Sequence, residues 1–122
     1  MTGSELYRHA LALMSLTSVR AKGYEELALP ILNELLADCF AVNNTLREEG
    51  GLSPLEEVPR MASLTGEIPF EEELCRRVLP FGLASMLLLE DDGGRSQWLY
   101  ERYEHARSQT GRALFEQIES AY

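Results

Sequence analysis

Ile68 to Asp92, IPFEEELCRRVLPFGLASMLLLEDD, is the stretch that decides the fold. Its apolar stripe recurs at three- and four-residue steps, the period of an amphipathic α-helix, at Leu74, Val78, Phe81, Ser85 and Leu88. The three glutamates at 71–73 fall in the first turn, where carboxylates complement the helix dipole; we do not interpret them as a metal or acid–base site. The spacing predicts a helix over about residues 69–90, with Pro69 at its first position.

Pro80 and Gly82 lie inside the most apolar part of this predicted helix. Proline removes one backbone hydrogen bond and crowds the carbonyl group four residues earlier, so we expect a kink near Pro80. Gly82 indicates that another helix crosses at close range. The following residues are apolar nearly all round, which predicts either the centre of the core or part of a subunit interface.

The chain before this stretch predicts two further helices. The first covers about residues 4–21, with Thr2 or Ser4 as N-cap, a capping-box glutamate at Glu5 and a stop at Gly23. The second covers about residues 24–43. Its Pro30 fits best in a first turn, so residues 24–29 are expected to form a separate turn or a kinked lead-in. Asn33 lies beside the apolar face and should bond a neighbouring helix or loop.

The remaining segments complete the predicted architecture. Residues 44–66 contain Gly50-Gly51, Pro54 and Pro59 and predict a long loop whose apolar residues pack along the bundle. A last helix is expected over about residues 96–120, with Ser96 as N-cap and arginines alternating with glutamates on a soluble face. The fold class is therefore all-α. We predict a single domain, residues 1–122, in which four main helices form a bundle with a long ordered loop between the second and third.

Composition limits the classes of function. Apolar residues make up 45% of the chain and charged residues 25%, a globular balance. The net charge of −9 disfavours binding to the phosphate backbone, so we expect no sequence-specific nucleic-acid ligand. No stretch approaches the roughly 20 apolar residues of a membrane span, and no secretory signal is recognisable, so we expect an intracellular protein without a membrane partner. Cys39 and Cys75 lie in apolar helical contexts and are interpreted as reduced core thiols.

The sequence offers no catalytic or metal-binding constellation. Its two histidines, His9 and His105, fall in the first and last predicted helices, and no spacing places a nucleophile beside a base. Phosphate-binding, dinucleotide-binding and zinc-protease motifs are missing. We therefore predict a protein that is not an enzyme, with no catalytic residue, no cofactor and no metal. A small helical enzyme stays open only because sequence cannot exclude buried carboxylates.

The order of elements resembles a known family. The quoted parts are ILNELLADCFAVNN, then SLTGEIPFEEELCRRVLPFGLASMLLLEDD, then a last helix opening WLYERYEHA. They are similar to the small helical head–tail adaptor (connector) proteins of tailed phages and prophages, over roughly residues 24–106. The most specific part pairs a Leu-Thr-x-Glu-Ile-Pro-like start with Leu-Pro-aromatic-Gly-Leu-Ala. Phe81 fills the aromatic position, where tyrosine is common in the family.

The resemblance implies a structural virion protein that assembles as a ring beneath the portal. It implies as partners other copies of the chain, the portal protein and stopper or tail proteins, with DNA passing through the ring. It implies a location in the host cytoplasm during assembly and then in the virion neck. A ring contact is heterologous, and the acidic loop and the last helix are candidates for its two surfaces. The predicted partner-binding residues are Arg102, Arg107, Leu114, Phe115, Ile118 and Tyr122. The alternative is a small acidic regulator or immunity-like protein that acts through protein–protein contact.

Overall fold

The computed structural model describes the backbone of residues 1–15 and 23–120 and the side chains of residues 1–15 and 23–110. The described part is all-α, as predicted; it contains no strand, and its single isolated β-bridge joins Thr2 to Glu67. The helices are α1 (Gly3–Leu13), α2 (Glu25–Asp38), α3 (Phe40–Glu49), α4 (Glu72–Arg77), α5 (Leu79–Leu87) and α6 (Gly93–Ser120). None of the helices in this part is long and apolar enough to cross a membrane.

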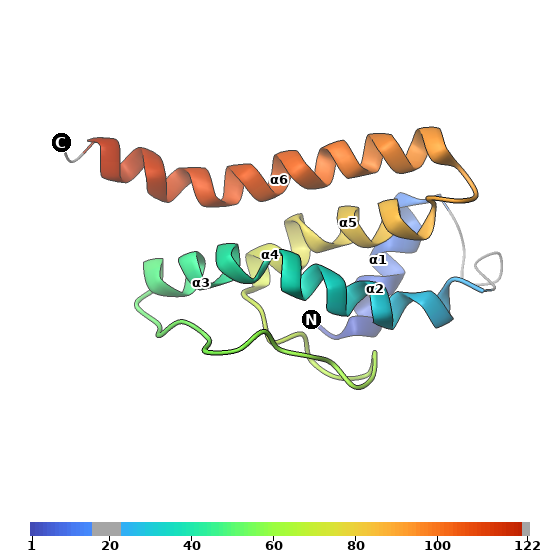
Figure 1. Cartoon of the computed structure of the whole chain (residues 1–122), viewed down its shortest axis with the longest axis horizontal. Helices are drawn as coiled ribbons and strands as arrows, with labels where there is room; N and C mark the ends of the chain where they lie inside the picture. Colours follow the sequence, from blue (N-terminus) through green and yellow to red (C-terminus); the bar gives the residue numbers. More distant parts are fainter. Residues whose placement is uncertain (16–22, 121–122) are drawn as a thin grey trace.

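Helix α5 is the centre of the fold (Figure 1). It contacts α1, α2, α4 and α6, and most of its residues are buried, among them Leu79, Leu83 and Leu87. A helix that is apolar on every side needs neighbours on every side. Helix α5 is therefore the centre of the core. Met86 and Leu89 are 42% and 65% exposed, so the subunit interface predicted for this segment stays a prediction.

Gly82 of α5 is the point of closest approach. A Cβ atom placed there would lie 2.9 Å from Leu35 of α2 and 2.9 Å from the ring of Tyr103 of α6. The predicted close crossing at Gly82 is therefore confirmed, and two helices share it. The two cysteines are also buried and free, as predicted: Cys39 between α2 and α3, and Cys75 in α4.

Two of the four predicted helices are each interrupted. The helix predicted over 24–43 breaks at Cys39 and then continues to Glu49. The break lets α2 pack on α5 while α3 packs on α6, which explains the wide apolar face of this stretch. The helix predicted over 69–90 begins three residues later, at Glu72, and breaks at Val78 instead of bending at Pro80. Pro80 lies in the first turn of α5, where its missing N–H is tolerated.

Other boundaries also differ from the prediction. Helix α1 is capped by Thr2, whose hydroxyl accepts a hydrogen bond from the Glu5 backbone N–H, but it ends at Leu13 and not near residue 21. Residues 16–21 of the predicted helix lie outside the described residues. Gly23, with a φ of 98°, comes just before α2 and does not end α1. Pro30 lies within α2, so the predicted separate turn over 24–29 is wrong.

Helix α6 begins at Gly93, three residues before the predicted N-cap. Asp92 accepts a hydrogen bond from the Arg95 backbone N–H, the geometry of an N-cap. Ser96 instead donates its hydroxyl to the backbone carbonyl of Ser85, at 2.6 Å, and so joins α6 to α5. The connection between α3 and α4 begins after Glu49, later than the predicted Asn44, because α3 includes residues 44–49.

Candidate functional site

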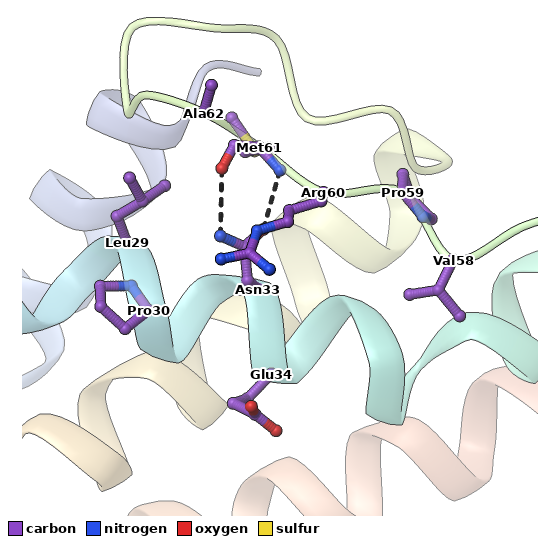
Figure 2. A pocket seen from close by; sticks show the side chains of 9 residues that line it. All are labelled: Leu29, Pro30, Asn33, Glu34, Val58, Pro59, Arg60, Met61 and Ala62. Carbon is purple, nitrogen blue, oxygen red and sulfur yellow. Dashed lines mark hydrogen bonds between the residues drawn. The ribbon is translucent and has the colours of Figure 1, made fainter.

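The long connection between α3 and α4 is held by three asparagines. Asn33 accepts from the Met61 backbone N–H at 2.8 Å and donates to the Met61 carbonyl at 3.1 Å, which confirms the loop contact predicted for it (Figure 2). Asn44 makes the same pair of bonds to the backbone of Leu55. Asn43 is fully buried and accepts from the Glu71 backbone N–H at 2.8 Å. Each amide replaces a backbone partner that the loop lacks.

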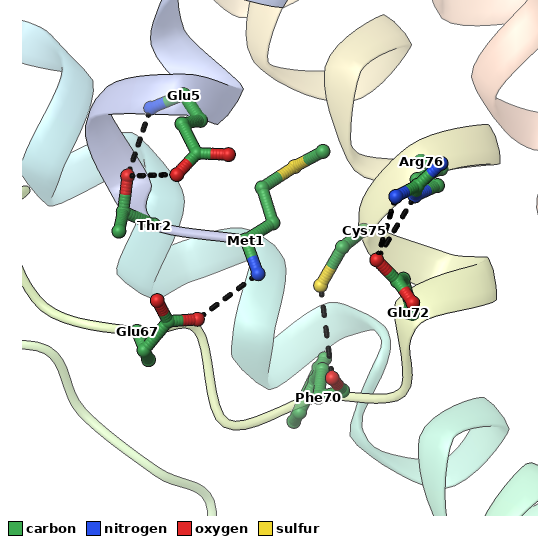
Figure 3. A network of polar contacts seen from close by, with 8 residues as sticks. All are labelled: Met1, Thr2, Glu5, Glu67, Phe70, Glu72, Cys75 and Arg76. Atoms are coloured by element: carbon green, nitrogen blue, oxygen red, sulfur yellow. Dashed lines mark hydrogen bonds and ion pairs between the residues drawn. The ribbon is translucent and has the colours of Figure 1, made fainter.

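The start of the chain holds the other side of this loop (Figure 3). The Met1 ammonium group bonds Glu67 at 3.0 Å, and the Ile68 N–H donates to the Met1 carbonyl. The Glu67 carboxylate raises the pKa of the Met1 amino group. Gly3 and Ser4 also donate their N–H groups to the loop, at the carbonyls of Gly66 and Leu64. The loop is thus held from both sides along most of its length.

A hollow of about 510 Å³ lies between α2 and residues 58–62 of the loop (Figure 2). Its lining combines apolar side chains with three polar ones, Asn33, Glu34 and Arg60. None of the side chains that line it is a nucleophile beside a base. Within the described part of the chain, no cluster of His, Cys, Asp or Glu could hold a metal ion.

A second group of polar side chains joins α2 to α6. The Tyr103 hydroxyl donates to the Asp38 carboxylate and lies 3.2 Å from the Cys39 sulfur. Arg107 pairs with Asp38 and with Glu104, and its guanidinium lies 5.2 Å from the Tyr103 ring centroid. Burial, then the bond to Asp38, raises the pKa of the Tyr103 hydroxyl, and burial raises the pKa of the Cys39 thiol. The Tyr103 hydroxyl and the Cys39 thiol therefore stay neutral near pH 7. Together these contacts connect the end of α2, where the helix breaks, to α6.

The predicted partner-binding residues therefore have different surroundings. Arg107 is half-buried and bound to carboxylates of its own chain. Arg102 is exposed, with its guanidinium 5.2 Å from the Trp98 ring centroid and 5.7 Å from that of Phe81. Leu114, Phe115 and Ile118 belong to the end of α6, and their side chains lie outside the described residues, as does Tyr122.

Sequence reasoning did not anticipate the groups that hold the loop and α6. Asn44, Asp38 and Tyr103 carry no spacing signal, because their partners are up to 65 residues away in the sequence.

Comparison of the chain with family models, curated proteins and solved structures finds no match.

Proposed function

We propose that the protein is a structural subunit of a head–tail adaptor of a tailed phage or prophage, and not an enzyme. Copies of the chain would assemble as a ring beneath the portal in the host cytoplasm and remain in the virion neck. The resemblance of the sequence supports this proposal. The residues that carry it have packing roles here: Glu67 bridges to Thr2, and the LPFGLA segment forms the first two-thirds of the central helix α5.

The shape of α6 is the observation that carries the proposal. Its 28 residues give a helix about 42 Å long. Among residues 93–110, whose side chains the structure describes, Ser96, Leu99, Tyr103 and Thr110 are buried. The backbone remains helical to Ser120, and this last part runs beyond the end of α3 (Figure 1). A helix that packs on the core through residues 96–110 and whose backbone continues beyond α3 is suited to reach a neighbouring protein.

The decisive experiment is the native mass of the chain, alone and mixed with the portal protein encoded beside it. The adaptor proposal expects a stoichiometric complex with the portal, or a ring. A chain that remains a monomer or dimer and does not bind the portal would contradict the adaptor proposal. That result would favour the alternative, a small acidic regulator or immunity-like protein.

A further inference from the structure

A basic and aromatic surface runs along one flank of α6. We call it the basic–aromatic strip and define it by Arg77 of α4, Phe81 of α5, and Trp98 and Arg102 of α6. Arg102 lies over the rings of both Trp98 and Phe81, and the Trp98 side chain is 49% exposed. One turn further along α6, Ala106 lines a hollow together with Arg77 and Glu73 of α4.

The two cations of this strip form no ion pair with a carboxylate in the part of the chain whose side chains are described. Arg47, Arg76 and Arg107 pair with nearby glutamates or aspartates. Arg77 and Arg102 are exposed and form no ion pair within the described residues. In a chain with twenty acidic and eleven basic residues, these two arginines are free to pair with carboxylates of another molecule.

The side chain of Arg102 is also preorganised for binding. Its contacts with two aromatic rings restrict the side chain, so less conformational freedom is lost when a ligand arrives. The edge of a guanidinium stacked in this way keeps donors for a bidentate bond to a carboxylate. Exposed tryptophan beside arginine is the combination that carries most of the binding energy at many protein interfaces. The strip therefore fits a segment that presents carboxylates next to apolar side chains.

The loop contains such a segment, residues 52–58, LSPLEEV, which we call the acidic loop segment. Leu52 and Val58 are 49% and 46% exposed. Glu56 and Glu57 are exposed and make no ion pair or hydrogen bond within the described residues. Its backbone is held in place by Asn44, which bonds Leu55, and by Arg47, which donates to the Ser53 carbonyl at 2.7 Å.

One chain cannot join these two surfaces to each other. Helix α6 lies along one edge of the molecule and the loop along the opposite edge (Figure 1). A contact between them must therefore link two copies, head to tail, and such heterologous contacts close into rings or continue as filaments. We propose that the basic–aromatic strip of one copy binds the acidic loop segment of the next. This inference deepens the proposed ring assembly and names the surfaces that would form it.

The experiment uses paired charge reversals. R102E places a glutamate opposite the acidic loop segment of the next copy, and E56R/E57R places two arginines opposite the strip. Because like charges repel, each variant alone should associate at least about tenfold more weakly than the wild type. In an equimolar mixture, the strip of R102E can bind the basic loop segment of E56R/E57R. The native strip of E56R/E57R can bind the native acidic loop segment of R102E. Association should therefore return. Sedimentation velocity should show association for the wild type and the mixture, and mainly monomer for each variant alone.

Trp98 gives a second, local measurement, because it is the only tryptophan in the chain. Its burial at the contact should shift the emission of the wild-type protein to shorter wavelength as concentration rises, and salt should reverse the shift. R8E, at an exposed arginine of α1 with no ion pair in the described part, is the control for R102E. E25R/E26R, at two exposed glutamates of α2, is the control for the loop variant. Both controls should associate as the wild type does.

Three results would overturn the inference: a wild-type chain that stays monomeric at its highest soluble concentration, controls as weak as the test variants, or no recovery in the mixture. Circular dichroism confirms folding, and R102Q replaces R102E if the charge reversal unfolds the chain. Portal binding is measured separately on each variant. If R102E associates as the wild type does and the portal is still bound, the strip contact fails while the adaptor proposal stands. If neither the wild type nor any variant binds the portal, the adaptor proposal is contradicted, whatever the result for the strip contact.

Discussion

A Cβ atom at Gly82 of α5 would stand 2.9 Å from the ring of Tyr103 of α6, closer than real Cβ contacts allow. The ring cannot move away easily, because its hydroxyl is bonded to Asp38 on α2. The central helix, the last helix and the end of α2 are therefore positioned by one another. This arrangement places Arg102 and Trp98, in the neighbouring turns of α6, at the surface.

Gly82→Ala should destabilise the fold. Alanine favours a helix by up to about 1 kcal/mol over glycine, but overpacking costs about 1–3 kcal/mol. We expect a net loss of about 1 kcal/mol and a melting temperature lower by about 2–8 °C. Thermal unfolding followed by circular dichroism measures this. Gly93→Ala is the control, because no atom lies within 4 Å of a Cβ at that position, and it should leave the melting temperature unchanged or slightly higher.

Asn33→Ala should release one side of the long loop. Both bonds to the Met61 backbone would be lost, and Met61 is only 6% exposed, so its N–H and carbonyl would lose partners at a cost of about 1–3 kcal/mol. Hydrogen exchange around Met61 should become faster in Asn33→Ala. Glu34→Ala, at the exposed neighbour, should leave this exchange unchanged. Equal protection of Met61 in the wild type and in Asn33→Ala would mean that the amide does not hold the loop.

Tyr103→Phe should measure the contribution of the hydroxyl separately from that of the ring. The ring would still pack against Gly82 and under Arg107, while the bond to the Asp38 carboxylate would be lost. Hydrogen bonds to charged groups contribute about 1.5–3 kcal/mol, so we expect a loss of that size in the free energy of unfolding measured with urea. A stability equal to that of the wild type would show that water replaces the hydroxyl bond without cost.

The same variant tests the pH dependence of stability. Burial and the bond to Asp38 raise the folded pKa of Tyr103 above its ordinary value of 10.0, so above that pH the unfolded chain loses a proton that the folded chain keeps. The stabilisation is therefore complete below pH 10.0 and decreases as the pH rises further. Urea unfolding between about pH 8 and 11 should show a shallower decrease for Tyr103→Phe. Tyr24, whose bond to Asp91 raises its pKa to about 12, contributes equally in both proteins. Parallel pH curves for the two proteins would contradict this assignment.

Truncation after Thr110 tests the role proposed for the end of α6. The shortened chain keeps the buried side chains Leu99, Tyr103 and Thr110 of α6, so it should retain helical circular dichroism and a cooperative melting transition. Under the adaptor proposal it should no longer form a complex with the portal. Loss of folding would assign the last ten helical residues to the core instead of to a partner.

The sequence by itself determined the all-α fold, the close approach at Gly82, the burial of the two cysteines and the polar contact of Asn33. These features follow from local signals: a helical period, a glycine within an apolar stripe and a polar residue beside a buried face. The signal that predicts a helix does not show where tertiary packing will interrupt it. The breaks at Cys39 and Val78 therefore became visible only in the folded chain.

Only the tertiary structure decided which residues surround the candidate surfaces. Asp38 meets Tyr103 and Arg107 because α2 and α6 pack beside α5, across more than sixty positions of sequence. The same packing pairs Arg107 with carboxylates of the chain and leaves Arg102 exposed over two rings, although both are arginines of one helix. Charge and spacing are local properties, whereas the pairing of a charge depends on which distant element lies beside it.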